Sequence, residues 1–341
     1  DSRLPDMLLL DVMMPGIDGY EVCRILRSQE RTSQLPVMMV TAKADSAEIV
    51  EGLRAGANDY VTKPIDMDVL LARVETHLHL QRLREQARET SDRLINDMRA
   101  AREVQQTMLP DAEALEQLPG AYGLRIAPVW KPKATLATDF WDMISLADGS
   151  LGLSMVDFGG TGVVPALKMF QFHSFFHAQC TGLYNAGLTM ARINSYLNKS
   201  LNEFELAYGS YTRFDPDTLQ FFHCAGGTPP PLVYRAENRA VERVRVRGLP
   251  LGPFLDAVHE ERRVSMKPGD RIVFATDGMF HAYSEERDYF SEKQLATILV
   301  RGAKNNLEDV AARLEAEIDD HVGEGRLRDD VTILMAELAN E

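Results

Sequence analysis

The stretch from residue 66 to residue 109 constrains the fold of this chain most, because it contains no glycine and no pattern typical of a β-strand. Apolar or small side chains recur there at steps of three and four, with glutamine, arginine and glutamate between them. They are Leu80, Leu83, Ala87, Thr90, Leu94, Met98, Ala101, Val104 and Met108. This spacing predicts one long helix that Pro110 ends. The chain therefore has three regions, which are residues 1–79, a helical linker over 80–110 and residues 111–341.

The apolar positions of the linker form a heptad-like seam that two arrangements explain. A self-paired coiled coil would join two copies of the chain in a homodimer, although Ala87, Thr90 and Ala101 make its seam weak. The alternative is a single amphipathic helix that lies on a neighbouring domain. The sequence leaves both arrangements open.

Length and composition describe a folded protein of more than one domain. The chain has 341 residues, of which 45% are hydrophobic and 26% are charged, so wholesale disorder is excluded. Its net charge of −14 repels the phosphates of nucleic acids. No apolar run approaches the roughly 18–20 residues of a membrane helix, and the three cysteines lie far apart. We therefore expect a cytoplasmic protein with no nucleic-acid partner and no membrane partner.

The first region alternates short apolar runs with helix-like stretches. Strands are predicted at Met7–Val12, at Leu35–Thr41 and at Asp59–Thr62, and helices at Tyr20–Ser28 and Ser46–Ala55. Continuous apolar runs are typical of strands that are buried on both faces of a parallel sheet. This order of strands and helices predicts right-handed crossovers and a doubly wound α/β sheet.

Three polar residues follow the predicted strands of this region. Asp11 ends the first strand, Thr41 ends the second and Lys63 follows the third. Ligands of open α/β sheets bind at this edge. A carboxylate there can accept a phosphoryl group, while an ammonium offsets the added charge and a hydroxyl donates a hydrogen bond to the new oxygens.

The segments around these residues resemble the receiver domain of bacterial response regulators, which has the flavodoxin-like fold of CheY. They are LLLDVMMPGIDGYEVCRILR, VMMVTAKAD and AGANDYVTKP. The resemblance implies that Asp11 is the phosphoacceptor, that Thr41 and Tyr60 are switch residues, and that Lys63 precedes a cis-prone Pro64. It also implies a sensor histidine kinase as partner and one Mg²⁺ in the complete receiver. Because the resemblance covers the second half of such a domain, we expect further receiver residues upstream of this sequence.

Residues 120–339 read mostly as strands and turns, with helical stretches at about 166–198 and 292–321. The turn at residues 147–150 separates two apolar runs and predicts a hairpin. A second hairpin is suggested around the glycines and prolines of residues 226–231. We expect an α+β domain with a β-sandwich core and flanking helices.

Four segments of this region each place an aspartate at a strand end. Asp139 opens one strand, Asp157 and Asp277 end two others, and Asp329 with Asp330 opens the last. Hard divalent cations such as Mg²⁺ and Mn²⁺ prefer carboxylate oxygens, and paired ions can activate a water for attack on a phosphoryl group. Asp-Gly is also common turn chemistry, so spacing alone leaves both interpretations open.

A longer series of segments resembles, in order, the SpoIIE/RsbU-type metal-dependent protein serine phosphatases. They are APVWKPKATLATDFWD, MVDFGGTGVVPALKM, AGGTPPPLV, RGLPLGPF, PGDRIVFATDGM and LRDDVTILM, and the helix AREVQQTMLP precedes them. The resemblance implies a catalytic centre of Asp157, Asp277 and Asp329 with two Mg²⁺ or Mn²⁺ ions. Asp157 would bridge both ions and the backbone carbonyl of Phe158 would contact the second. The outer shell would consist of Asp139 and Asp330.

Some positions depart from the family pattern. Ala137-Thr138 replaces a glycine pair, and Phe158-Gly159-Gly160-Thr161 replaces a Val-Ser-Gly-Lys run, so a bulky side chain follows the bridging aspartate. Every expected metal carboxylate is nevertheless present. The resemblance thus predicts a response regulator whose phosphorylation at Asp11 controls a phosphatase acting on a phosphorylated STAS-domain anti-sigma-factor antagonist in the general stress response. The alternative is an RssB-like adaptor, a pseudophosphatase that binds a sigma factor or its regulators.

Two histidines remain outside this scheme. His173 and His177 are spaced i, i+4 on a predicted helix, which could bind a metal ion. No acidic residue accompanies them in the sequence, and the segment KMFQFHSFFH is rich in aromatic residues. Packing in the core is the favoured interpretation.

Overall fold

The computed structural model describes residues 4–42, 46–202, 205–286, 288–323 and 325–339. The chain divides into two compact units, Asp1–Asn96 and Asp97–Glu341, and the division falls within helix α3 (Met67–Met108). This 42-residue helix is the one expected from residues 66–109. No helix in the described ranges is long and apolar enough to cross a membrane.

The first unit contains a parallel three-stranded sheet in the order β1-β2-β3. Its elements before α3 are β1 (Leu8–Asp11), α1 (Gly19–Ser28), β2 (Val37–Thr41), α2 (Ser46–Arg54) and β3 (Asp59–Thr62). Alternate residues of β2 pack into different clusters, since Met39 lies with Cys23 of α1 whereas Met38 lies with Leu70 of α3. The predicted α/β receiver architecture is confirmed.

Helix α1 begins directly beside the end of β1. Its N-cap residue Asp18 accepts a hydrogen bond from the Glu21 backbone N–H at 2.8 Å, which satisfies an otherwise unpaired donor. A Cβ atom on Gly19 would lie 2.4 Å from the carbonyl oxygen of Asp11. Only glycine therefore permits this close approach of the helix to Asp11.

Helix α3 is anchored near both ends. Near its start, Arg73 Nη1 donates to both carboxylate oxygens of Asp59 at 2.7 and 2.8 Å. Near its end, the buried amide of Gln105 donates to the carbonyl of Ala137 and accepts from its N–H, both at 3.1 Å. Leu94, in the seam between these anchors, is 55% exposed. The helix thus lies against a neighbouring domain through its last turns, and self-pairing of the seam stays a prediction.

The second unit is a sandwich of two five-stranded antiparallel sheets. One sheet has the order β10-β9-β12-β15-β4 and the other the order β11-β8-β7-β6-β5. The strands are β4 (Leu124–Lys131), β5 (Asp139–Ser145), β6 (Leu151–Phe158), β7 (Ala207–Asp215), β8 (Gln220–Gly226), β9 (Leu232–Arg235), β10 (Ala240–Arg243), β11 (Glu261–Ser265), β12 (Arg271–Ala275) and β15 (Val331–Leu338). A separate two-stranded ribbon pairs β13 (Tyr283–Ser284) with β14 (Asp288–Tyr289).

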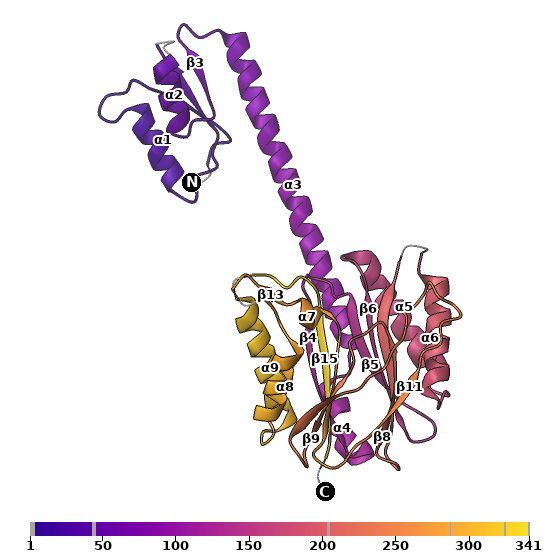
Figure 1. Ribbon diagram of the computed structural model, residues 1–341. Helices are drawn as coiled ribbons and strands as arrows, with labels where there is room; N and C mark the ends of the chain where they lie inside the picture. Colours follow the sequence, from indigo (N-terminus) through magenta and orange to yellow (C-terminus); the bar gives the residue numbers. More distant parts are fainter. Residues whose placement is uncertain (1–3, 43–45, 203–204, 287, 324, 340–341) are drawn as a thin grey trace. The chain divides into compact units, whose positions relative to one another are not determined.

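Helices cover the outer faces of the sandwich (Figure 1). Helices α5 (Val163–Gln179) and α6 (Ala186–Ser200) cover one sheet, and α7 (Gly278–His281), α8 (Glu292–Arg301) and α9 (Leu307–Val322) cover the other. Helix α4 (Ala112–Tyr122) instead contributes Leu118 to the core between the sheets. Trp141, Phe221 and Ile272 belong to the core between the sheets. Phe172 of α5 packs on the outer face of one sheet, and Leu314 of α9 on that of the other. The expected β-sandwich with flanking helices is confirmed.

Two details of the predicted secondary structure were wrong. Each long helical stretch is a pair of helices, α5 with α6 and α8 with α9. The hairpin expected around residues 226–231 does not form, because β8 and β9 belong to different sheets. Prolines lack the N–H that a tight hairpin ladder needs, and the segment containing Pro229, Pro230 and Pro231 instead crosses from one sheet to the other. The hairpin of β5 and β6 is present as expected.

Candidate functional sites

The receiver site lies at the carboxyl edge of the first unit's sheet. Asp11 is the last residue of β1, and its Oδ2 is 2.5 Å from Nζ of Lys63, which follows β3. The buried Thr41 ends β2, and its carbonyl accepts a hydrogen bond from the Lys63 backbone N–H at 2.7 Å. The Lys63–Pro64 peptide bond is cis. The fold thus brings together the three residues that the strand ends nominated.

The charge of Asp11 is stabilised by its neighbours. The hydrogen bond from Lys63 and a further one from the Met13 backbone N–H lower the pKa of this carboxyl below its usual value. The Asp11 side chain is 37% exposed, so a phosphate donor can reach it. Tyr60 lies within β3, before Lys63 in the chain, and the guanidinium carbon of Arg73 is 5.9 Å from the centre of its ring.

The second candidate site joins the two sheets of the sandwich. Asp139 and Asp157 are directly opposite each other on β5 and β6 of one sheet. Asp277 follows β12 and Asp329 precedes β15, which are neighbouring strands of the other sheet. Oδ2 of Asp139 accepts a hydrogen bond from Thr276 Oγ1 at 2.7 Å, which links the two sheets at this point.

Asp330 is a structural anchor of this site. Its carboxylate accepts hydrogen bonds from the backbone N–H groups of Lys133, Thr138 and Asp139 at 2.7, 2.6 and 3.2 Å, and from the Thr138 hydroxyl at 3.1 Å. Thr138 is one of the departures from the family's glycine pair, and its hydroxyl adds a bond that glycine could not make. A Cβ on Gly278 would lie 1.8 Å from the Asp330 carbonyl oxygen, so glycine is required where the Asp277 turn meets this segment.

Asp157 lies buried among other carboxylates of the second unit. It is 4% exposed, and its Oδ1 has no hydrogen-bond partner in the described part of the chain. Burial and the charges of Asp329, Asp277 and Asp330 raise the pKa of Asp157 from 3.8 to about 7. Burial and Asp157 likewise raise the pKa of Asp139 well above its usual value. A buried group of carboxylates is stabilised either by protonation or, when it is ionised, by a compensating cation.

Lys133 supplies one such positive charge, and sequence reasoning missed it. Its Nζ is 2.6 Å from Asp329 Oδ1. Burial alone would lower the pKa of Lys133, but the hydrogen bond and charge of Asp329, with the charges of Asp330 and Asp157, raise it. Lys133 lies between β4 and β5 in the segment KPKAT, where only its closeness in sequence to Asp139 indicated a role.

A histidine also lies beside these carboxylates. His281 Nδ1 is 4.0 Å from Asp329 Oδ2. Asp277, His281 and Asp329 can each offer one ligand atom within 4.8 Å of the others. The sequence analysis did not single out His281, because no motif contains it. Its position four residues after Asp277, about one helical turn, was the signal that could have found it.

The bulky Phe158 does not crowd the carboxylates. Its ring is 2% exposed and packs against Phe172 of α5, with ring centroids 6.1 Å apart. Gly160 and Gly162, in the loop that follows, have φ angles of 110° and 92°, a conformation that favours glycine. The loop therefore keeps the glycines that its backbone requires, although its sequence departs from the family pattern.

Comparison with known proteins supports both halves of this description. A model of the stage II sporulation protein E (SpoIIE) family matches residues 147–339, and a model of the response regulator receiver domain matches residues 1–75. The chain therefore belongs to the SpoIIE family and carries a receiver domain ahead of its PP2C-type phosphatase fold.

Individual relatives resemble one unit at a time. The phosphate regulon transcriptional regulatory protein PhoB of Rhizobium meliloti is 50% identical over 77 residues, which are 23% of this chain and 34% of that protein. The chain thus spans about a third of the length of the curated relatives it matches. The SiaA-PP2C domain of Pseudomonas aeruginosa is 20% identical, with a TM-score of 0.63 over 73% of this chain and 98% of that one.

A further similar structure contains the RsbU and RsbW domains of a Mycobacterium tuberculosis protein. It is 23% identical, with a TM-score of 0.54 over 63% of this chain and 59% of that one. At these identities the two structural likenesses establish the fold of the second unit and leave its chemistry to the residues themselves.

Proposed function

We propose that the second unit is a metal-dependent protein serine/threonine phosphatase. Asp157, Asp277 and Asp329 would hold two Mg²⁺ or Mn²⁺ ions, with Asp157 between them and the Phe158 carbonyl as a further ligand. The observation that carries this proposal is Asp157, a buried carboxylate with an unpartnered oxygen and a pKa raised to about 7 by its acidic neighbours. Oxygen-rich acidic clusters fit hard divalent cations.

The chain's own residues would prepare the site in two ways. Asp139 and Asp330 would act from the outer shell, since hydrogen bonds with Thr276 and with the β4–β5 segment hold the two sheets in register. The ammonium of Lys133 lies beside Asp329, where it can attract a phosphate group. Bound divalent ions would supply a water of lowered pKa and neutralise charge on the phosphoryl group.

Control by the first unit is the second part of the proposal. A sensor histidine kinase would phosphorylate Asp11, whose carboxylate is ionised, exposed and paired with Lys63. The receiver would hold one Mg²⁺ for this reaction. Thr41 and Tyr60 would respond to the phosphate as switch residues, and α3, which is continuous between the units, would carry the change to the phosphatase.

For the substrate we propose the phosphoserine of a STAS-domain anti-sigma-factor antagonist, which places the protein in the general stress response. The support is membership of the SpoIIE family together with the similarity to a protein that joins RsbU and RsbW domains.

A second candidate is a non-catalytic adaptor that binds a sigma factor or its regulators. Lys133 favours it, because an ammonium 2.6 Å from Asp329 already compensates part of the acidic charge that a metal ion would neutralise. The altered residues around Thr138 and Phe158 favour it as well. The adaptor needs the same surface but no bound ion and no turnover.

The comparison of wild type with Asp157→Asn separates the two candidates. With Mn²⁺ present, wild type should release phosphate from a phosphorylated STAS-domain antagonist, and Asp157→Asn should be at least about a hundredfold slower, since even partners of metal ligands are worth 10–100-fold. Mn²⁺ should raise the melting temperature of wild type more than that of the variant.

The matched control is Asp217→Asn, which neutralises an exposed aspartate in the turn between β7 and β8. Its phosphate release should equal that of wild type. If wild type and Asp157→Asn release phosphate equally slowly while both bind the antagonist or a sigma factor tightly, the adaptor is correct.

A further inference from the structure

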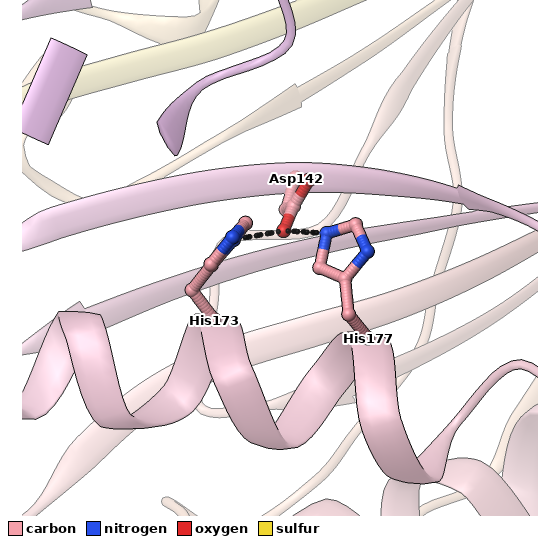
Figure 2. Close-up of side chains that lie close together, drawn as sticks. All are labelled: Asp142, His173 and His177. Carbon is pink, nitrogen blue, oxygen red and sulfur yellow. Dashed lines mark hydrogen bonds and ion pairs between the residues drawn. The ribbon is translucent and has the colours of Figure 1, made fainter. Parts of the chain in front are cut away.

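Two helical histidines and a buried aspartate form a separate cluster in the second unit. His173 Nδ1 and His177 Nε2 lie 2.8 and 2.9 Å from the same oxygen, Oδ2 of Asp142 (Figure 2). The sequence showed no acidic residue near the histidines, because Asp142 precedes His173 by 31 residues. The fold brings β5 against α5 and supplies the carboxylate that was missing.

This cluster is distinct from the aspartate centre. Successive residues of a strand point to opposite faces of the sheet. Asp139 and Trp141 lie on the face of β5 toward the sandwich interior, where Trp141 belongs to the inter-sheet core. Phe140 and Ile144 belong to the cluster under α5, and Asp142 shares their face. The histidine cluster therefore lies on the helix-covered side of the sheet.

The surrounding groups hold the three side chains in place. Asp142 Oδ1 accepts a hydrogen bond from the Met143 backbone N–H at 2.7 Å, which leaves Oδ2 for the histidines. His173 meets Phe140 edge-on with ring centroids 5.7 Å apart, and His177 meets Phe176 edge-on at 6.1 Å. Such supporting contacts fix the orientation of ligands in known metal sites.

Exposure differs sharply within the cluster. The Asp142 side chain is 3% exposed, whereas those of His173 and His177 are 28% and 45% exposed. A metal ion placed between the three groups could reach water on the histidine side and complete its coordination there. The cluster thus offers a buried carboxylate, two imidazole nitrogens and a coordination position that is open to water.

We propose that Asp142, His173 and His177 bind a divalent transition-metal ion of the zinc class. One ligand atom from each residue lies within 4.8 Å of the others. A tetrahedral Zn²⁺ with bonds of about 2.0–2.1 Å separates its ligand atoms by about 3.3 Å. Each nitrogen would therefore move about half an ångström away from Oδ2, and the two nitrogens, which lie within 4.8 Å of each other, would adjust toward the same spacing. Two imidazoles and one carboxylate select such ions over Mg²⁺, which prefers oxygen.

Metal binding would replace two hydrogen bonds by three coordinate bonds. Without the ion, Oδ2 of Asp142 accepts hydrogen bonds from the ring N–H groups at Nδ1 of His173 and Nε2 of His177. With the ion bound, these two nitrogens would be unprotonated ligands and each neutral ring would carry its proton on its other nitrogen, while a ring that was doubly protonated would release one proton to solvent. The ion would tie the C-terminal half of α5 to β5, and α5 is the helix that follows the glycine loop after Asp157.

The test measures zinc binding by the full chain after removal of metal with a chelator. All variants carry Asp157→Asn, which weakens metal binding at the aspartate centre. Zinc that still binds tightly is then bound at the histidine cluster. In that background, one Zn²⁺ should bind, and His173→Gln or His177→Gln should weaken its Kd at least about tenfold. Excess Mg²⁺ should not displace it. Both histidines are partly exposed, so these variants should fold.

Two further variants serve as controls. His281→Gln removes the histidine beside the aspartate centre, and His79→Gln removes an exposed histidine of α3. Neither should change the tight zinc Kd. If His173→Gln lowers the melting temperature but leaves the number and affinity of bound zinc ions unchanged, the cluster is only a hydrogen-bonded link between α5 and β5. The result does not depend on phosphatase activity, so it stands or fails separately from the proposed function.

Discussion

The receiver unit and the phosphatase-like unit each hold an aspartate against a lysine, yet the surroundings of the two pairs differ. Lys63 lies 2.5 Å from Asp11, and Lys133 lies 2.6 Å from Asp329. The pKa of Asp11 is lowered by its lysine, whereas burial and acidic neighbours raise the pKa of Asp157 to about 7. One site is a single ionised carboxylate at an open sheet edge, and the other is a crowded acidic cluster.

The difference follows from burial and from the number of like charges. Asp11 is 37% exposed and faces one cation, so water and Lys63 both favour its charged form. Asp157 is 4% exposed among several aspartates, so one ammonium does not offset their repulsion. An exposed, ionised carboxylate is suited to attack a phosphoryl donor, while a buried group of carboxylates is suited to hold cations. The charge state of an aspartate beside a lysine therefore depends on burial and on the other charges nearby.

The largest expected effect concerns the receiver pair. Wild-type protein incubated with acetyl phosphate and Mg²⁺ should gain one phosphate, and Asp11→Asn should gain none because it lacks the nucleophilic carboxylate oxygen. Mass spectrometry of the intact protein measures the gain. Asp18→Asn, a change at an exposed cap of α1, is the control and should still accept phosphate. An equal gain in Asp11→Asn would show that another residue is the acceptor.

The pH dependence of stability should differ between the two units. The pKa of Asp157 in the folded chain is raised above 3.8. Its favourable contribution to the free energy of unfolding is therefore complete below about pH 4 and is lost as the pH rises through about 7. The folded pKa of Asp11 is lowered, so its contribution is lost only as the pH falls through that lowered pKa. Metal-free protein should thus lose stability in the second unit between about pH 4 and 7.

Tryptophan fluorescence during urea unfolding can follow this change in the second unit alone. Both tryptophans of the chain, Trp130 and Trp141, lie in that unit. Asp157→Asn should flatten the dependence because its amide does not titrate, and saturating Mn²⁺ should also flatten it by compensating the carboxylates. A wild-type profile without a fall between pH 4 and 7 would contradict the raised pKa.

A smaller effect is expected from removal of the cation in the second unit. In Lys133→Gln the ammonium no longer competes with a metal ion for Asp329, so Mn²⁺ should bind several-fold more tightly. The metal-free variant should also melt at a lower temperature, since the acidic cluster loses its internal cation. Calorimetric titration and thermal unfolding measure the two changes. Lys131→Gln, which removes a lysine that pairs with α9, is the matched control for loss of charge.

The smallest effect on either unit is expected from Leu94→Pro, although it should break the connection between them. A proline inside a helix costs about 3 kcal/mol locally. Leu94 is exposed in the middle of α3, so both units should keep their melting temperatures. Phosphorylation should then no longer change phosphate release or antagonist binding. If regulation survives, α3 is only a tether.

Local signals in the sequence were sufficient for the positions of most elements. The apolar runs located β1, β2 and β3, and the glycine-free stretch located α3 to within one residue at each end. Aspartates at strand ends nominated Asp157, Asp277 and Asp329, and in the folded chain the charges of Asp277 and Asp329 act on Asp157. These predictions succeed because strand period, helix period and turn chemistry depend on neighbouring residues.

Contacts between distant segments were beyond such reasoning. The sequence could not show that Lys133 lies against Asp329, that β8 and β9 belong to different sheets, or that Asp142 completes a cluster with His173 and His177. Each depends on how one sheet packs on the other or on a helix. The raised pKa of Asp157 has the same origin, because burial and like charges exist only after folding. Sequence thus determined which side chains are available, and the tertiary structure decided which of them meet and in what charge state, since separation in space and exclusion of water are properties of the packed chain.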